Sequence, residues 1–168
     1  MSGLPHPAGG SRRADRPPQG RIDFVRRHLV AAVLMLLSTA ASAATPIIVH
    51  RDPGCGCCEK WAKQVQAQLG RRVTIIDDQA RAALQRAHGV PVTLSSCHTV
   101  LVDGIVFEGH VPIADMRRVL TQRPKGISGL AVAGMPLGSP GMEVPGQAKQ
   151  SYVVAAFGAS GTRIYARH

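Results

Sequence analysis

The stretch TPIIVHRDPGCGCCEKWAKQVQAQLG, residues 45–70, decides the fold of this chain. Its first six residues form a short β-branched run beside a proline, which predicts a buried strand at 45–50. From residue 59 onwards, apolar residues recur at a spacing of four, at Trp61, Val65 and Leu69. A glycine then follows as a stop signal, so we expect a helix over 59–70. The three cysteines of the stretch therefore lie between a strand and a helix.

The next segments continue the alternation of strand and helix. RRVTIIDD (71–78) predicts a second strand, and QARAALQRAHGVP (79–91) predicts a helix that a glycine and a proline end. The apolar residues of this helix that we expect to face inwards are Ala80, Ala83, Leu84 and Ala87. HTVLVDGIVFEGHV (98–111) predicts two strands around Asp103–Gly104, because Asp-Gly between apolar runs favours a tight hairpin turn.

The last segments complete the expected domain. PIADMRRVL (112–120) predicts a short helix that its proline opens, with Ile113, Met116 and Leu120 facing the core. The order β-α-β-α-β-β-α, with a right-handed crossover between the first two strands, is typical of a thioredoxin-like α/β fold, a mixed sheet flanked by helices. The glycine- and proline-rich segment 125–146 predicts a loop without helix or strand. Residues 151–168 predict an appended C-terminal hairpin about GASG.

We expect residues 1–43 to hold an N-terminal extension, rich in Pro, Gly and Arg up to residue 20, followed by an export signal. Arg26 and Arg27 form a basic region, an unbroken apolar run covers Leu29–Leu37, and a small-residue cleavage site ends at Ala43. The apolar run is too short to span a bilayer, which takes about 20 residues. We therefore expect a periplasmic domain of residues 44–168 with no stable membrane span after cleavage. An uncleaved anchor is the alternative, and the arginine pair leaves general and twin-arginine export open.

Charge argues against one class of partner. The whole chain carries +10, but six Arg and two Asp lie before Ala44, so residues 44–168 carry +6. This excess is scattered without a basic run, and few aromatic residues are present to stack on bases. Nucleic-acid binding is therefore not expected.

Cys55 and Cys58 form a C-x-x-C at the start of the expected helix, where unpaired N–H groups and the helix dipole favour the thiolate. Taken alone, this motif indicates a redox dithiol with Cys55 as nucleophile and Cys58 as the resolving thiol. Cys57 adds a third thiol, which invites wrong disulfides in an exchange enzyme but suits a site where thiolates share soft metal ions. Export also leaves a structural disulfide open.

Further donors follow downstream. Cys97 and His98, in SSCHT, precede the third strand, at the junction that faces the C-x-x-C in thioredoxin-like proteins and usually carries a proline. His110 ends the predicted hairpin near the same end of the sheet. Met135 and Met142 lie in GMPLGSPGM, a loop that offers a methionine few core neighbours. The alternatives are that Cys97 is a small buried apolar residue and that His98 is structural.

The donor types favour copper. Thiolate and thioether sulfur select Cu(I), and imidazole is a borderline donor that also suits copper. Zinc is the competitor, because four thiolates suit it, but methionine is a poor zinc ligand and the thiols do not form two separate C-x-x-C pairs. No known ligand spacing for an iron–sulfur cluster matches.

The segments DPGCGCCEKW, GVPVTLSSCHTVLVDGIVFEGHVP and GLAVAGMPLGSPGME together resemble the signatures of the CopG-type periplasmic copper-resistance proteins of bacteria. The resemblance covers essentially the whole chain after Ala43. It implies a thioredoxin-like fold, several copper ions bridged by thiolates, and a role in copper handling that extends to interconversion of Cu(I) and Cu(II). The site residues it carries over by motif match are Cys55, Cys57, Cys58, Cys97 and His110, followed by His98, Met135 and Met142.

Three functions stay open at this point. The first is an exported protein that binds several Cu(I) ions, with binding expected rather than enzymatic turnover and with other periplasmic copper-handling proteins as partners. The second is a periplasmic thiol–disulfide oxidoreductase that uses Cys55 and Cys58. The third is a disulfide-stabilised binding domain.

Overall fold

A computed structural model describes residues 45–168, so the predicted signal segment and its cleavage after Ala43 lie outside the described residues. The described chain forms a mixed sheet of seven strands in the order β2-β1-β3-β4-β5-β6-β7. The strands are β1 (Ile47–Arg51), β2 (Val73–Asp77), β3 (His98–Val102), β4 (Ile105–Glu108), β5 (Gly129–Ala131), β6 (Val153–Phe157) and β7 (Arg163–Arg167). The helices are α2 (Gly56–Leu69), α3 (Arg81–Ala87) and α4 (Ile113–Gln122), with a 3-10 turn, η1 (Val92–Leu94).

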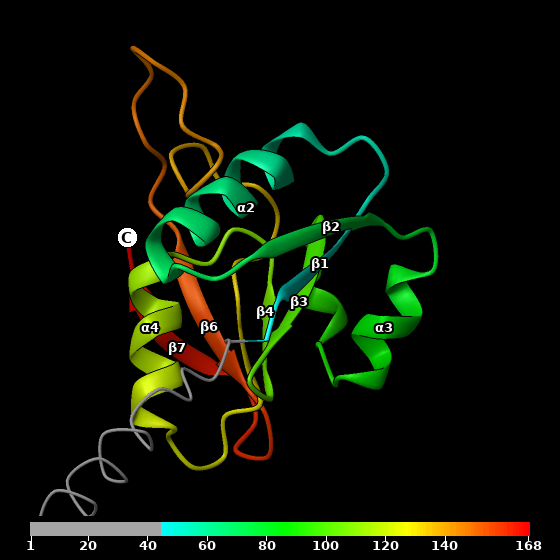
Figure 1. Ribbon diagram of the computed structural model, residues 1–168. Coiled ribbons are helices and arrows are strands. Elements are labelled where there is room, and N and C mark those ends of the chain that lie inside the picture. The colour runs from blue at the N-terminus through cyan, green and yellow to red at the C-terminus, as the bar shows by residue number, and fades with distance from the viewer. Residues whose placement is uncertain (1–44) are drawn as a thin grey trace, which may run out of the picture. The chain divides into compact units, whose positions relative to one another are not determined.

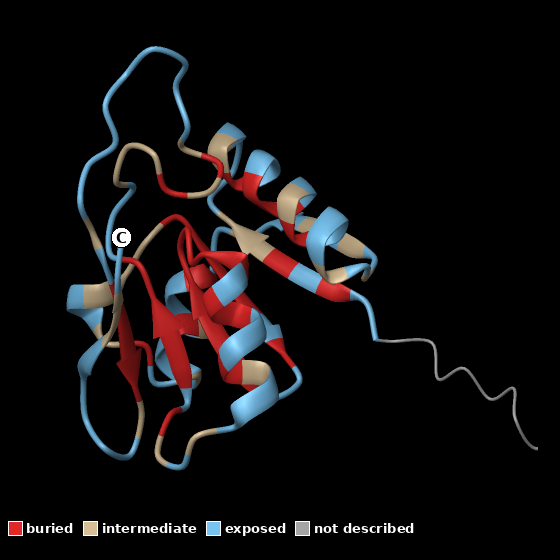
Figure 2. Ribbon diagram, turned by 90° about the vertical axis from the view of Figure 1, so that its left-hand side faces the viewer, coloured by how far each residue is buried: buried red, intermediate tan, exposed pale blue. Residues whose placement is uncertain are grey.

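Helices cover both faces of this sheet. Figure 1 shows α2 and α4 on one face and α3 on the other. The main core lies under α2 and α4, where apolar side chains of both helices meet inward residues of β1 and β3: Trp61, Val65, Met116 and Val119 pack with Ile47, Val49, Val100 and Val102. Figure 2 shows the resulting layer of buried central strands. Within residues 45–168, no helix combines the length and apolar character needed to cross a membrane.

The strand directions follow the predicted order of elements. β2 runs parallel to β1, whereas β3 is antiparallel to both β1 and β4. Asp103 and Gly104 join β3 to β4 with φ of 48° and 81°, the left-handed pair that a two-residue hairpin turn needs. The mixed α/β sheet flanked by helices is thus confirmed. The thioredoxin-like subclass stays a prediction.

The prediction that segment 125–146 contains no strand is wrong. Its residues Gly129–Ala131 form β5, which pairs parallel to β4 and antiparallel to β6. A Cβ at Gly129 would lie 2.3 Å from Cζ of Phe157 and 2.6 Å from the carbonyl oxygen of Val106, so only glycine lets the strands approach. Through β5, the predicted C-terminal hairpin, now β6 and β7, becomes part of the main sheet.

The inward face of α3 also differs from the prediction. Ala83 and Ala87 are exposed, whereas Arg81 and Gln85 are buried. Both buried residues donate hydrogen bonds to the carboxylate of Glu108, which has no exposed surface. The apolar pattern predicted the wrong face of α3 because the residue of the sheet that this helix contacts is a buried acid, Glu108, rather than an apolar side chain.

Candidate metal centre

Backbone hydrogen bonds join the two segments that carry the cysteines. The N–H of Asp52 donates to the carbonyl of Cys97 at 3.0 Å, and the N–H of Cys55 donates to the carbonyl of Asp52 at 3.2 Å. Cys55 is the N-cap of α2, and Cys57 and Cys58 lie in its first turn. The turn from β1 into α2 therefore places three cysteines beside the loop that carries the fourth.

The four cysteine Sγ atoms form a compact cluster, in which all of them lie within 4.8 Å of one another. Cys55 and Cys58 are joined by a disulfide, and Cys57 and Cys97 are free thiols. The Sγ of Cys57 lies 3.3 Å from that of Cys55, and the Sγ of Cys97 lies 3.3 Å from that of Cys58. Cys58 and Cys97 are buried, whereas Cys55 and Cys57 are half-buried. One side of this sulfur cluster thus faces the interior and the other side faces solvent.

Two histidines lie beside the buried side of the sulfur cluster. Nε2 of His110 lies 3.1 Å from the Sγ of Cys97, and Nδ1 of His98 lies 3.5 Å from the same sulfur. Nδ1 of His110 lies 2.8 Å from the carbonyl oxygen of Pro140 and donates to it, since a carbonyl can only accept. Nδ1 therefore carries the hydrogen of the neutral ring, and the lone pair of Nε2 faces Cys97.

Burial keeps these donors uncharged. It raises the pKa of the Cys97 thiol to about 12, and the neighbouring Cys57 adds to this shift. It lowers the pKa of His98 well below its usual value, and the nearby Arg81 charge adds to this shift, as would a proton on His110. Burial also lowers the pKa of His110. Both imidazoles are therefore neutral at pH 7 and free to ligate, whereas a metal ion must displace the Cys97 proton to bind there.

His98 has a ring nitrogen without a partner. The side chain is fully buried, with its ring centroid 4.4 Å from that of Trp61 and 5.0 Å from that of His110. Across residues 45–168, its Nε2 is the one buried side-chain nitrogen or oxygen that makes no hydrogen bond. Leaving such an atom unpaired costs about 1–3 kcal/mol. The His98 nitrogen recorded beside the sulfur cluster is Nδ1, 3.5 Å from the Sγ of Cys97, and this imidazole and the soft sulfur donors together fit copper.

The glycine-rich loop closes over the start of α2, as its composition predicts. Gly141 is buried with φ of +84°, and a Cβ there would lie 2.6 Å from the carbonyl oxygen of Cys57. Met135, which is 53% exposed, places its Sδ 3.9 Å from the Sγ of Cys57. Met142 is half-buried in the same loop, and within the described chain its sulfur makes no hydrogen-bond contact with the cluster. Seven of the eight predicted site residues are thus brought together.

A buried carboxylate behind the cluster was not predicted as part of the site. Glu108 accepts hydrogen bonds from the N–H of Ser96 and from Gln85, both at 2.7 Å, and from the hydroxyl of Thr99 at 2.6 Å. Burial raises the pKa of Glu108, although these hydrogen bonds oppose the shift. The sequence signal was a single acid at the end of the otherwise apolar run IVFE.

Arg81 links this carboxylate to the other cysteine segment. Its guanidinium donates to Glu108 at 3.3 Å and to Asp52 at 2.8 Å. Asp52 lies three residues before Cys55, and Ser96, which Glu108 holds, lies directly before Cys97. Arg81 and Glu108 therefore fix the spacing between the two loops that carry the sulfur cluster.

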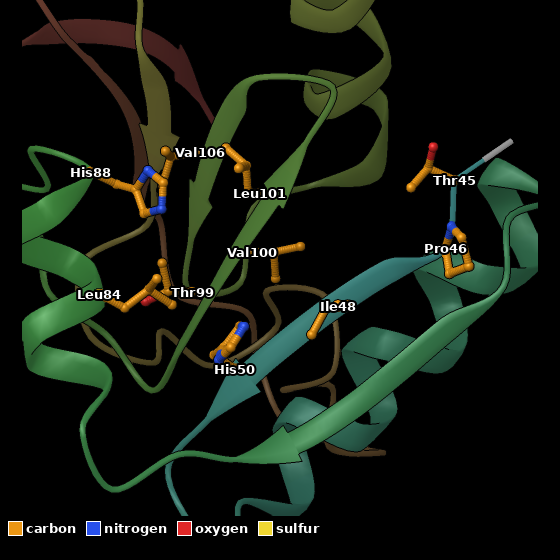
Figure 3. A pocket seen from close by; sticks show the side chains of 10 residues that line it. All are labelled: Thr45, Pro46, Ile48, His50, Leu84, His88, Thr99, Val100, Leu101 and Val106. Carbon is orange, nitrogen blue, oxygen red and sulfur yellow. The ribbon is translucent and has the colours of Figure 1, made fainter.

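A separate pocket lies between α3 and the sheet (Figure 3). Ile48, Leu84 and Leu101 line it together with His50 and His88, and neither cysteine nor methionine is among its lining residues. The Nδ1 of His50 lies 2.9 Å from a carboxylate oxygen of Asp78. This pocket therefore contributes none of the donors of the metal centre.

Comparisons with known proteins give two kinds of match. Residues 94–142, which include Cys97, His98, His110 and both loop methionines, match a family described as a protein of unknown function, DUF411. Two solved structures are similar over nearly their whole length: "Copper resistance protein copG- Form 1", with 40% identity, covers 74% of this chain and 98% of its own, at a TM-score of 0.68. "Copper resistance protein copG- Form 2", with 40% identity, covers 73% of this chain and 97% of its own, at a TM-score of 0.67. Among curated proteins, no relative matches.

Proposed function

Because the chain belongs to the CopG-type family of copper-resistance proteins, we propose that it is an exported protein that holds several Cu(I) ions in the cysteine–histidine cluster. The observation that carries this proposal is the donor set. Four Sγ atoms lie within 4.8 Å of one another, and Cys97, His98 and His110 form an overlapping second group. Thiolate, thioether and imidazole together match the preferences of Cu(I) better than those of zinc.

The ions share their sulfur ligands. Four thiolates are too few to give several copper ions separate full shells, so thiolates bridge the ions. His110 and His98 complete the coordination at the buried end, and Met135 completes it at the exposed end. The Met142 thioether is a further donor of the proposed site. Within the periplasm, the cargo is exchanged with other copper-handling proteins.

The disulfide can supply and accept the electrons that the proposed interconversion of Cu(I) and Cu(II) requires. Two thiols, those of Cys55 and Cys58, release two electrons and two protons when they form the disulfide. Two Cu(II) ions accept these electrons and become Cu(I). The reverse step returns the electrons to the disulfide. The position of the disulfide within the donor cluster supports this coupling.

Metal analysis of protein spanning residues 44–168, purified without oxygen and reduced, tests the proposal. We expect more than one copper per chain, retained through gel filtration. A metal-free protein that reduces a test disulfide would support the alternative, an oxidoreductase that uses Cys55 and Cys58. A metal-free protein without that activity would support a disulfide-stabilised binding domain. Either result would overturn the copper proposal.

A further inference from the structure

Strand β2 forms one edge of the sheet, because within residues 45–168 only β1 pairs with it. The carbonyl of Arg72 accepts a hydrogen bond from the first residue of β1, and the N–H of Asp78 donates one to the last. The even-numbered residues of this segment therefore bond to β1. Because backbone groups alternate in direction along a strand, the N–H and C=O groups of Val73, Ile75 and Asp77 point out of the sheet.

This outer edge is open to a further strand. In the part of the chain that the structure describes, the backbone groups of Ile75 and Asp77 face no strand. The N–H of Val73 meets only the side-chain oxygen of Gln66, at 3.3 Å. Ile76 is apolar and yet 41% exposed. A strand with unpaired backbone groups is a template on which another extended segment can pair.

The sequence of this edge is complementary to itself. RRVTIIDD, residues 71–78, begins with two arginines, ends with two aspartates and carries no charge between them. Two copies of the segment placed antiparallel bring the basic end of each beside the acidic end of the other. Opposite charges directly across a strand pair stabilise the pair. The charge pattern therefore favours a second copy of this chain as the partner.

We infer that two copies of the protein pair antiparallel through β2, about a two-fold axis that passes through the sheet at Ile75, and join their sheets into one. In this register Ile75 lies opposite its own copy, and Val73 lies opposite Asp77 of the other copy. The outward-pointing groups of the two chains then bond to each other. Because the axis is perpendicular to the sheet, both α2 helices lie on one face and both α3 helices lie on the other.

The same register gives each copy an ion pair. Arg72 lies opposite Asp78 of the other copy, and Thr74 lies opposite Ile76, in the positions where facing side chains approach most closely. Arg72 is exposed, and within the described residues it forms no ion pair. The Asp78 carboxylate is held 2.9 Å from Nδ1 of His50, so its position on the strand is fixed. The two-fold axis produces two such pairs in each dimer.

The opposite edge of the sheet lacks this complementarity. Strand β7 has the sequence RIYAR, with Arg163 at one end and Arg167 at the other. Antiparallel pairing of two β7 strands centred on Tyr165 sets Arg163 opposite Arg167, and like charges directly opposite destabilise a strand pair. Of the two edges, β2 is thus the one that suits a second copy, and β7 provides a matched control.

Sedimentation equilibrium of protein spanning residues 44–168, which form one compact unit, tests the pairing. The protein is metal-free with its disulfide intact, and mass spectrometry without reductant checks that no disulfide joins two chains. Two five-residue strands form a small contact, so we expect a reversible dimer that accumulates from micromolar to millimolar concentration. Neither this measurement nor the next depends on copper.

Arg72→Glu sets a carboxylate opposite Asp78 in both symmetry-related pairs, so it should weaken the dimer about tenfold. Arg163→Glu, on β7, should leave the dimer unchanged. Thermal melts check that both variants are folded. A wild-type protein that stays monomeric at every concentration would overturn the inference. So would an Arg72→Glu dimer as tight as the wild type, or a dimer that Arg163→Glu weakens equally.

Amide hydrogen exchange measured by NMR locates the contact. The N–H groups of Ile75 and Asp77 should exchange rapidly in dilute protein and slowly at millimolar concentration, because only the dimer supplies their acceptors. The N–H groups of Thr74 and Ile76 point towards β1 and should be protected at both concentrations. Arg72→Glu should remove the added protection. A dimer in which Ile75 and Asp77 still exchange rapidly would show that the copies meet through another surface, contrary to the inference.

Discussion

The Sγ of Cys57 and the Sδ of Met135 lie 3.9 Å apart, although 78 residues separate them in the chain. Met135 is 53% exposed, so it is held there by the course of its loop rather than by burial in the core. A half-exposed thioether beside a thiol is placed to bind a soft metal ion, and its contribution to the site can be separated from its contribution to the fold.

Met135→Leu should weaken Cu(I) binding while the stability of the metal-free protein stays within about 1.5 kcal/mol of wild type, because leucine is similar in volume. Zinc affinity should not change, since methionine is a poor zinc ligand. The measurement is a Cu(I) chelator titration beside thermal melts. Met142→Leu is the matched variant and tests the second predicted methionine. Unchanged Cu(I) affinity in Met135→Leu would show that this residue is not a ligand.

Cys57→Ser should lose copper about as severely as Cys55→Ser or Cys58→Ser, because a shared cluster needs every bridging thiolate. In a redox dithiol, by contrast, the middle cysteine is dispensable. Copper per chain and disulfide-reductase activity are measured on all three reduced variants. A Cys57→Ser protein that keeps its copper and reduces a test disulfide would favour the oxidoreductase.

Gly141→Ala should displace the loop, because its Cβ would lie 2.6 Å from the Cys57 carbonyl oxygen and 2.8 Å from the Trp61 nitrogen. Gly146→Ala is a matched control with a similar φ, +77° against +84°, and with no atom within 4 Å of its Cβ. In both variants, an alanine in the left-handed backbone conformation lowers the unfolding free energy by about 1–2 kcal/mol.

The Gly141 variant should lose about 1–3 kcal/mol more than the Gly146 variant, measured by urea unfolding, because overpacking adds to the backbone cost. It should also lose Cu(I) affinity, because Met135 and the Pro140 carbonyl move with the loop. Equal unfolding free energies for the two variants would contradict the close contact over α2.

Acid should destabilise the metal-free protein through His98. Burial holds the folded pKa of His98 below its unfolded value of about 6.5. The contribution of His98 to stability is therefore complete above pH 6.5 and is lost as pH falls towards the lower folded pKa. In this window one such group changes the unfolding free energy by up to about 1.4 kcal/mol per pH step of one.

His98→Asn removes one titrating group and should make that dependence shallower between pH 7.5 and 5, leaving the share that comes from His110, whose pKa burial also lowers. The comparison is made by urea unfolding of both proteins with the disulfide intact. Parallel curves for wild type and variant would exclude His98 as the source of the acid sensitivity.

Export of the full-length chain should give a protein that begins at Ala44. We expect this from three features of the sequence: the basic pair, the apolar run and the small residues that end at Ala43. N-terminal sequencing of protein recovered from the periplasm measures it. A folded periplasmic protein that retains RRHLV would show that the segment is not removed.

Local sequence patterns predicted the elements whose causes are local. The Asp103–Gly104 turn and the Pro112 helix start were correct because each depends on backbone preferences of adjacent residues. Strand β5 was missed because the need for glycine at position 129 comes from Phe157 and Val106. These residues lie on neighbouring strands and leave no room for a Cβ there. A glycine that weakens a strand locally is here the residue that lets the strand fit.

The candidate site divides in the same way. The cysteine motif and the motifs around Cys97 and Met135 indicated which residues could gather, but the arrangement of the sulfur cluster depends on long-range packing. The burial of Arg81 was not predicted because its partners, Asp52 and Glu108, lie on separate segments of the chain. A helical arginine among alanines carries no local sign that it will be buried.

The position of Trp61 gives the protein an intrinsic optical probe. It is the sole tryptophan of the sequence, it has no exposed surface, and its ring lies 4.4 Å from that of His98. Its fluorescence therefore arises from one environment at the edge of the cluster, and Cu(II) bound there should quench it by electron or energy transfer. Stopped-flow emission could then follow arrival, reduction and departure of copper in the unlabelled wild-type chain.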